Sequence, residues 1–255
     1  MTLVIQPLPG IPLVNPGDDL PAIILNAVEQ AHITMMDGDI LVLAQKIVSK
    51  AEARQVNLTH VTPSDEAKRL AALCHKDARF VELVLRESQS VLRVSPGILI
   101  VEHRCGFICA NAGIDHSNVI TDWGNADDWV LMLPEDADRS ARQIRMRVEQ
   151  KTGVHIGVLI IDSHGRAWRM GVIGMAIGMS GIPGLVDFRG KKDLFGYSLR
   201  VTEVAAADEL AAAASLVMGE AAEGTPIVHV RGFPYPLREG SLAELIRPRA
   251  QDLFR

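Results

Sequence analysis

Apolar residues occur along this chain in short runs that end at polar turns, a pattern typical of strands alternating with helices. The run Val158–Ile161 is almost continuous and predicts a strand buried on both faces. Ile40–Ala44 predicts a second buried strand. The other expected strands are Thr2–Gln6, Val91–Val94, Ile98–Glu102, Leu131–Pro134, Ser198–Val204 and Ile227–Gly232.

Segments with a helical spacing of apolar residues lie between these runs. Pro21–Ala31 predicts an amphipathic helix that begins at Asp18 or Asp19, and Ser140–Gly153 predicts one that ends at its glycine. Ala78–Glu87 and a helix that begins near Thr62 are also expected. The alanine-rich stretch from Glu203 to Met218 predicts a further helix, whose small side chains permit close packing.

Composition narrows the class of protein. The 255 residues are 48% hydrophobic, so the chain can bury a large core in one large or two modest domains. A net charge of -5 argues against a protein that tracks nucleic-acid phosphates, and 4% aromatic residues argue against stacking of single strands. Three cysteines, no apolar run of membrane-spanning length and no signal sequence favour a cytoplasmic protein with reduced thiols.

The first candidate site follows the run Val158–Ile161. Asp162 and Ser163 offer a carboxylate and a hydroxyl, which can hold a hard cation, although an aspartate here can equally be a turn former. Arg166 and Arg169 come next and could bind phosphate oxygens. The glycines from Gly171 to Gly181 are spaced so that backbone can approach something closely.

Three other stretches carry candidate chemistry. Gln45, Lys46, Ser49 and Lys50 follow the strand Ile40–Ala44 and could surround an anion, although lysines are common on surfaces. Asp115 and Asn118 lie in a loop that follows another expected strand. Asp115 could be a metal ligand and Asn118 could bond the polar edge of a ligand, or both could be turn formers. Glu220 follows the alanine-rich helix, where the helix dipole favours a cation. A solvated acidic helix end explains Glu220 equally well.

Six long stretches follow one another from near the N-terminus to Gly232: PLPGIPLVNPGDDL, GDILVLAQKIVSKAE, CANAGIDHSN, GVLIIDSHGRAWRMGVIGMAIGMSG, GKKDLFGYSL and LVMGEAAEGTPIVHVRG. Taken together and in this order, they resemble the coenzyme F420-0:gamma-glutamyl ligase family. The resemblance implies an enzyme that joins L-glutamate to the lactyl carboxylate of coenzyme F420-0, using GTP and two divalent ions, Mg or Mn. It also implies an α+β fold with mixed and antiparallel sheets, two subdomains and an intertwined homodimer. A monovalent cation is a further possible requirement.

The resemblance also implies roles for individual residues. The divalent ions would be held by Asp115, Asp162, Ser163 and Glu220, and the catalytic set would be Asp115, Asp162 and Arg166. The residues lining GTP would be Pro9, Gly10, Ile11, Pro12, Gln45, Lys46, Lys50, Asn118, Met218, Gly219, Glu220, Ala221, Ala222, Glu223, Gly224 and Thr225. Lys46 and Lys50 are the expected phosphate contacts.

The sequence departs from the family pattern at two places. The pair matching Gln45-Lys46 is often a small hydroxylic pair in the family, and the residue matching Ser163 is often threonine. We expect no C-terminal flavin-binding domain. Three other functions fit the same residues: a ligase acting on a different carboxylate, a metal-dependent nucleotide hydrolase, and a nucleotide-binding module without turnover.

Overall fold

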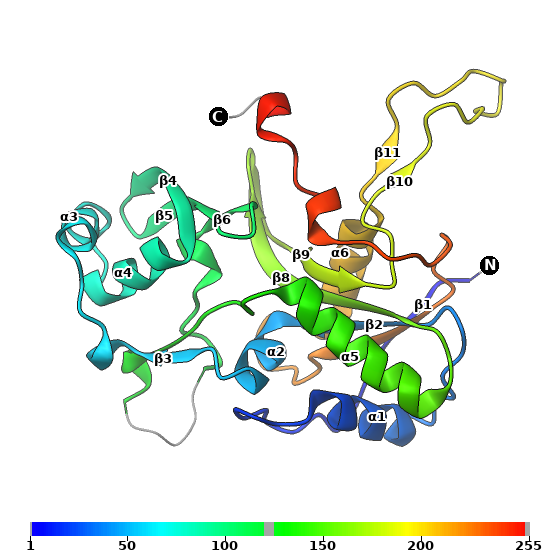
Figure 1. The fold of residues 1–255 in the computed structure, drawn as a ribbon, viewed down its shortest axis with the longest axis horizontal. Coiled ribbons are helices and arrows are strands. Elements are labelled where there is room, and N and C mark those ends of the chain that lie inside the picture. Colours follow the sequence, from blue (N-terminus) through cyan, green and yellow to red (C-terminus); the bar gives the residue numbers. More distant parts are fainter. Residues whose placement is uncertain (1, 120–124, 253–255) are drawn as a thin grey trace.

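The computed structural model describes residues 2–119 and 125–252 (Figure 1). At its centre is a five-stranded sheet in the order β1-β12-β2-β8-β9. These strands are β1 (Val4–Pro7), β12 (Ile227–Arg231), β2 (Ile40–Ala44), β8 (Gly157–Arg166) and β9 (Arg169–Ser180). Only β2 and β8 run parallel, and the other three pairs are antiparallel. The sheet is therefore mixed, in agreement with the expected α+β class.

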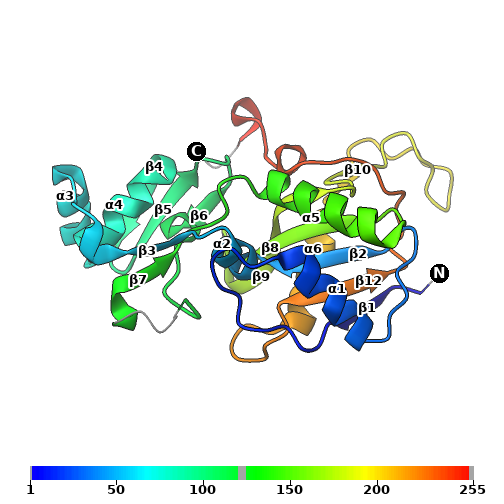
Figure 2. The same ribbon diagram turned by 60° about the horizontal axis from the view of Figure 1, so that its bottom comes forward.

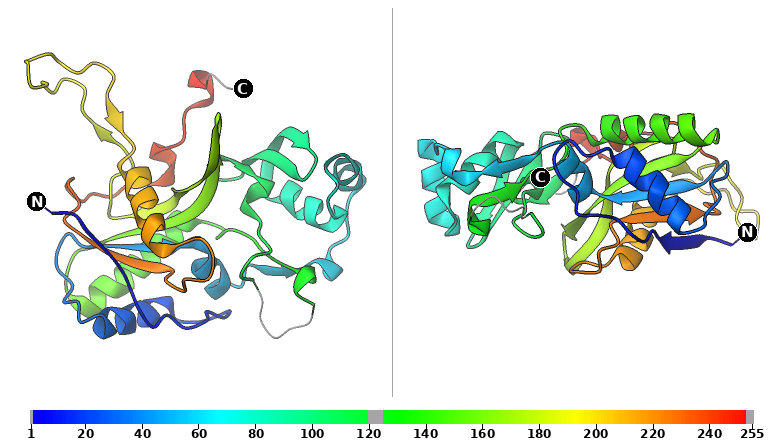
Figure 3. Two further views of the ribbon diagram at one scale, coloured as in Figure 1. Left: turned by 180° about the vertical axis from the view of Figure 1, so that it is seen from behind. Right: turned by 90° about the horizontal axis from the view of Figure 1, so that it is seen from below.

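Helices cover both faces of this sheet, which explains why β2 and the start of β8 are apolar at every position. The helices α1 (Leu20–Gln30) and α5 (Ala137–Thr152) lie on one face, and α6 (Ala206–Met218) lies on the other (Figures 1 and 3). Alternate strand residues pack toward each side. Leu41, Leu43, Val158 and Ile160 join the core cluster that contains residues of α1 and α5, whereas Ile40, Val42, Leu159 and Ile161 join the cluster that contains residues of α6.

Two glycines of β9 let the helices approach the sheet closely. A Cβ at Gly178 would lie 2.4 Å from the Cβ of Ala137 in α5. A Cβ at Gly174 would lie 2.5 Å from the carbonyl oxygen of Ala211 in α6. The predicted close approach of backbone at these glycines is therefore confirmed, and what approaches them is helix.

A smaller lobe lies to one side of the central sheet (Figures 1 and 2). Its elements are β3 (Gln55–Asn57), α3 (Asp65–Cys74), α4 (Ala78–Arg86), β4 (Ser88–Ser95), β5 (Ile98–His103), β6 (Ile108–Ala110) and β7 (Trp129–Leu131). The strands β4, β5 and β6 form one antiparallel sheet, and β3 pairs with β7. Val81 and Leu99 of this lobe belong to the same core cluster as Leu43 and Ile144. The apolar core thus runs continuously from the central sheet into the lobe, and the two subdomains remain a prediction.

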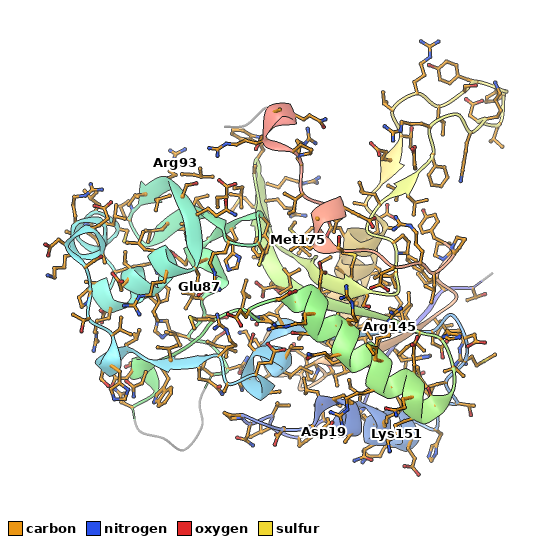
Figure 4. All side chains as sticks on the ribbon, in the orientation of Figure 1. Asp19, Glu87, Arg93, Arg145, Lys151 and Met175 are labelled. Atoms are coloured by element: carbon orange, nitrogen blue, oxygen red, sulfur yellow. The ribbon has the colours of Figure 1, made fainter. Side chains whose placement is uncertain are left out.

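The remaining segments lie at the edges of the molecule. The strands β10 (Val186–Asp187) and β11 (Glu203–Val204) form a ribbon whose connecting loop projects outward (Figure 1, yellow). After β12 the chain runs beside α5, where Arg145 Nη2 lies 2.9 Å from Glu239 Oε2 (Figure 4).

The short helices are α2 (Gln45–Ala51), η1 (Leu58–His60), η2 (Asn111–Gly113), η3 (Ala126–Asp128), η4 (Leu242–Glu244) and η5 (Arg249–Gln251). No helix in the described parts of the chain is long and apolar enough to cross a membrane.

Several sequence-based boundaries are wrong. The predicted strand Leu131–Pro134 is instead Trp129–Leu131, which pairs with β3. The strand β8 does not stop before Asp162 but continues to Arg166, paired with β9. The predicted strand Ser198–Val204 is reduced to Glu203–Val204, because most of that segment lies in the projecting loop with no sheet beside it. The alanine-rich helix begins at Ala206 and not at Glu203.

Candidate active site

Four segments from distant parts of the sequence meet at one edge of the central sheet because of the strand directions. In the parallel pair, Ala44 of β2 lies opposite Ile161 of β8, so the residues that follow both strands reach the same edge. Antiparallel β12 begins at this edge, with Ile227 opposite Leu43. β1 ends there, with Pro7 opposite Val228. Four segments are therefore neighbours: those that follow β1 and β2, the part of β8 beyond Ile161, and the segment that precedes β12.

A cleft of about 800 Å³ lies at this edge of the sheet and is completed by the loop after β6 from the smaller lobe. Most of the predicted site residues line it: Ile11, Pro12, Gln45, Lys46, Lys50, Asp115, Asn118, Asp162, Ser163, Met218, Gly219, Glu220, Ala221, Ala222, Glu223, Gly224 and Thr225. The predicted residues Pro9, Gly10 and Arg166 are not among its lining residues. One cleft thus collects carboxylates, a hydroxyl and two lysines that the sequence spreads over more than half of its length.

The lysines of the cleft come from α2, which begins directly after β2. Lys46 and Lys50 are one helical turn apart and both line the cleft. Gln45 is 2% exposed, and its Oε1 accepts a hydrogen bond of 2.8 Å from the Ser49 hydroxyl. Burial lowers the pKa of Lys50, and the charge of Lys46 lowers it further. Two ammonium groups held this close form a region of positive potential that favours a polyanion.

Lys46 bridges α2 and the loop after β6. Its Nζ lies 2.6 Å from Asp115 Oδ2 and donates to the Ser117 hydroxyl oxygen at 2.6 Å. The Ser117 backbone N–H donates to Asp115 Oδ1 at 2.8 Å, and its hydroxyl donates to Oδ2 at 2.8 Å. Burial alone would raise the pKa of Asp115, but the hydrogen bond from Lys46 and those from Ser117 outweigh burial and hold this pKa below its usual value. Asp115 is therefore a carboxylate anion at neutral pH.

The opposite wall of the cleft joins β8 to the segment after α6. The Ser163 hydroxyl donates to Glu220 Oε2 at 2.7 Å. The segment is shaped by its own contacts: Gly219 ends α6 with φ 76°, and Thr225 Oγ1 donates to the Met218 carbonyl oxygen at 2.9 Å. Asn118 Nδ2 donates to the Ala221 carbonyl oxygen at 3.2 Å, which ties the loop after β6 to this segment.

Asp162 lies inside β8, at the point where β8 passes the end of β2. Its Oδ2 lies 3.0 Å from Nε2 of His164, a residue that is 5% exposed and also lines the cleft. The sequence pattern indicates no role for His164, because the apolar run that predicts the strand ends before Asp162. In a strand, residues two apart point to the same side, so a longer predicted strand would have paired the two side chains.

The two arginines lie at the far end of the β8–β9 hairpin. Arg166 and Arg169 are opposite each other in the strand pairing, and Arg166 Nη2 donates to the Met170 carbonyl oxygen at 3.2 Å. The role of Arg166 in catalysis remains a prediction.

The oxygen atoms in the cleft suit a hard divalent ion. Among the described residues, no group of three or more His, Cys, Asp or Glu side chains stands close enough together to hold one. Each carboxylate is instead held by another group: Asp115 by Lys46, Asp162 by His164 and Glu220 by Ser163. Ser163 Oγ and Glu220 Oε2 lie 2.7 Å apart because a hydrogen bond joins them, and both are oxygen donors of the kind that a hard divalent ion prefers.

Comparison with known proteins places this cleft in a family. The model of the F420-0:Gamma-glutamyl ligase family matches residues 10–232. A relative from Methanopyrus kandleri, called coenzyme F420:L-glutamate ligase, is 46% identical over 100% of this chain and 98% of its own length. Relatives of the same name from Methanothermobacter thermautotrophicus and Archaeoglobus fulgidus are 45% and 42% identical. The first alignment covers 96% of both chains, and the second covers 100% of this chain and 97% of the relative.

The matches confirm the resemblance seen in the sequence, and they include every segment that meets at the edge of the central sheet. Because the family model matches most of the chain and the relatives align over nearly their full lengths, this protein belongs to the F420-0:Gamma-glutamyl ligase family.

Proposed function

We propose that this protein is a coenzyme F420:L-glutamate ligase that forms an amide between the amine of L-glutamate and the lactyl carboxylate of coenzyme F420-0, with GTP as the source of energy. The observation that carries the proposal is the cleft itself, where two lysines, four carboxylates and several hydroxyl groups line one volume of about 800 Å³. The names of the relatives support the two substrates.

Activation of the acceptor is the first requirement, because an oxide is too poor a leaving group for direct amide formation. In the proposed reaction an oxygen of the lactyl carboxylate attacks the γ-phosphorus of GTP, the bond from that phosphorus to the β–γ bridging oxygen breaks, and GDP leaves. The glutamate amine then attacks the acyl carbon of the acyl phosphate. Phosphate leaves, and the amine gives up a proton. Each amide bond therefore releases one phosphate and one GDP.

The protein contributes mainly position and charge to such a phosphoryl transfer. Lys46 and Lys50 supply positive charge for the phosphates from one face of α2. Ile11 and Pro12 and the segment from Met218 to Thr225 form the remaining walls that would hold the nucleotide. Further additions of γ-glutamyl units are part of the proposal.

Two divalent ions, Mg or Mn, complete the proposal. Asp115, Asp162, Ser163 and Glu220 would hold these ions. Bound ions would neutralise charge that develops on the phosphate oxygens. The cation already held by Asp115 is Lys46, so ion binding requires this ammonium to move toward the phosphates.

We also propose that the working form is a homodimer. Large apolar side chains stand exposed at two projecting parts of the structure: Met170 is 97% exposed, and Leu194, Phe195 and Val201 of the β10–β11 loop are 98%, 94% and 85% exposed. Exposed apolar groups of this size are typical of interaction surfaces. A second copy of the chain accounts for both patches. Light scattering of wild type and of Phe195→Asp tests this, and equal masses for the two proteins would contradict a dimer made through the loop.

The mass of the product tests the ligase reaction directly. Incubation with F420-0, L-glutamate, GTP and Mn or Mg should give a deazaflavin product heavier by one or more glutamyl units. A related ligase with a different acceptor would leave F420-0 unchanged while consuming GTP in the presence of its own substrate.

A further inference from the structure

His164 lines both the cleft and a second, smaller pocket. It lines the cleft together with Asp162, and it lines a pocket of about 190 Å³ together with Asp208 of α6 and Met175 of β9. Figure 4 labels Met175, where β9 passes the C-terminal segment. With 5% exposure, the imidazole is nearly enclosed by protein.

The ring is held in place by aromatic packing. The ring of Phe107 lies 5.3 Å from that of His164, at 45°. On its other side, Phe107 stacks against His103 at 4.8 Å and 4°. All three side chains are buried, so their packing restrains the His164 ring beside Asp162.

The hydrogen-bond partners assign the tautomer of His164. An ionised carboxylate only accepts hydrogen bonds, so Nε2 must carry the proton that it donates to Asp162 Oδ2 at 3.0 Å. Nδ1 is buried and has no hydrogen-bond partner among the described residues. The ring therefore has one polar contact within the described structure, and that contact is to a predicted metal ligand.

We propose that His164 is a positioning residue for Asp162: its Nε2–H holds Oδ2 of the carboxylate and leaves Oδ1 free for the cation in the cleft. This inference rests on the proposed function, since it needs a divalent ion at Asp162. Hydrogen bonds to ligating groups fix their orientation, and loss of such a partner typically lowers metal affinity 10–100-fold.

The competing explanation is that His164 only fills space in the aromatic stack. His103 provides the matched control, because it is equally buried and packs on the same phenylalanine, but its ring makes no contact with Asp162. A phenylalanine at either position keeps the aromatic packing. Only His164→Phe removes the donor to Asp162, and His164→Gln restores an N–H donor near the same place.

The test is manganese binding in the absence of nucleotide and substrates. The electron paramagnetic resonance signal of free Mn measures the binding, and the melting temperature of each protein checks that it is folded. We expect His164→Phe to weaken Mn binding about 10–100-fold, His164→Gln to recover part of the loss, and His103→Phe to bind Mn like wild type. Equal affinities in wild type and His164→Phe, or equal losses in His164→Phe and His103→Phe, would overturn the positioning role.

The outcomes also separate this inference from the proposed function. If wild type binds no Mn, the metal part of the proposed function fails, and the positioning role fails with it. If wild type binds Mn and His164→Phe binds it as tightly, the proposed function stands and the positioning role alone is wrong. If His164→Phe does not fold, His164→Gln is compared with His164→Met, which has a similar size but no hydrogen-bond donor: weaker Mn binding by His164→Met than by His164→Gln supports the role of the donor, and equal affinities of the two variants contradict it.

Discussion

Lys46 Nζ lies 2.6 Å from Asp115 Oδ2, and this contact joins the helix after β2 to the loop of the smaller lobe. The two side chains have opposite tasks in the proposed reaction, because the lysine binds phosphate and the aspartate binds a metal ion. In the structure each side chain neutralises the charge of the other. The pair therefore keeps a positive charge in the cleft for phosphate and a negative charge for a metal ion.

Replacement of Lys46 by methionine separates these two tasks. We expect Lys46→Met to raise the KM for GTP about tenfold or more, the cost of one charge-assisted hydrogen bond to phosphate. Mn affinity without nucleotide should not fall, because the lysine competes with the ion for Asp115. Lys68→Met is the control, since Lys68 pairs with Asp65 on the exposed face of α3. A Lys46→Met enzyme with unchanged KM for GTP would remove Lys46 from the phosphate site.

Asp162→Asn tests the metal assignment. A bound metal ion contributes several kcal/mol to the stabilisation of the transition state, so kcat should fall about 1000-fold. The circular dichroism spectrum and the melting temperature should stay close to those of wild type. Asp187→Asn is the control, because Asp187 is an exposed residue of β10 paired with Arg189. Full activity of Asp162→Asn would show that the metal assignment is wrong.

The glycines of β9 make a prediction about stability. Gly178→Ala places a methyl group 2.4 Å from Ala137 of α5, so the helix must shift. Overpacking of this kind costs about 1–3 kcal/mol of unfolding free energy. Gly165→Ala is the matched control in neighbouring β8, because nothing lies within 4 Å of its added Cβ, and its effect should stay within about 1 kcal/mol. Urea unfolding measures both variants, and equal stabilities would contradict the close packing of α5.

The buried carboxylate of Asp39 predicts a dependence of stability on pH. Burial alone would raise its pKa, but hydrogen bonds from Arg231, His229 and the Met36 N–H outweigh burial and hold the pKa below 3.8. Arg231 binds both carboxylate oxygens, at 2.8 and 2.6 Å. Because the folded-state pKa is lowered, the stabilisation is complete above the unfolded-state pKa and is lost as pH falls through the folded-state pKa.

Asp39→Asn should therefore be less stable than wild type at neutral pH, by about 2 kcal/mol for the loss of hydrogen bonds to a charged group. The difference between the two proteins should stay constant above about pH 5 and shrink as the pH falls below the unfolded-state pKa of about 3.9 toward the lower folded-state pKa. Unfolding free energies across this range provide the measurement. A difference that stays constant, or grows, at low pH would contradict the assignment of the ion pair.

Much of the fold could be predicted from local patterns. The bounds of β2 follow from its apolar run, and α5 ends at Gly153, which has the positive φ of 76° that glycine adopts most easily. The strand β8 was predicted too short for a physical reason. Beyond Ile161 it has no partner in β2 and borders the cleft, so its residues are polar although they continue the strand.

The site could be predicted residue by residue from the family resemblance, with or without independent support from side-chain chemistry. Asp115, Asp162, Ser163 and Glu220 were named, and all of them line the cleft. Their partners were not foreseeable. The contact between Lys46 and Asp115 depends on how the smaller lobe docks on α2, and the contact between Asp162 and His164 depends on where β8 ends. Long-range packing, and not local sequence, decides both.

The release of phosphate from GTP tests the central claim most directly. It should be measured with Mn or Mg, first in the complete mixture and then with F420-0 and L-glutamate each omitted in turn. A ligase that works through an acyl phosphate should release phosphate at its full rate only when both substrates are present. Release that continues without F420-0 would contradict the ligase and indicate a nucleotide hydrolase instead.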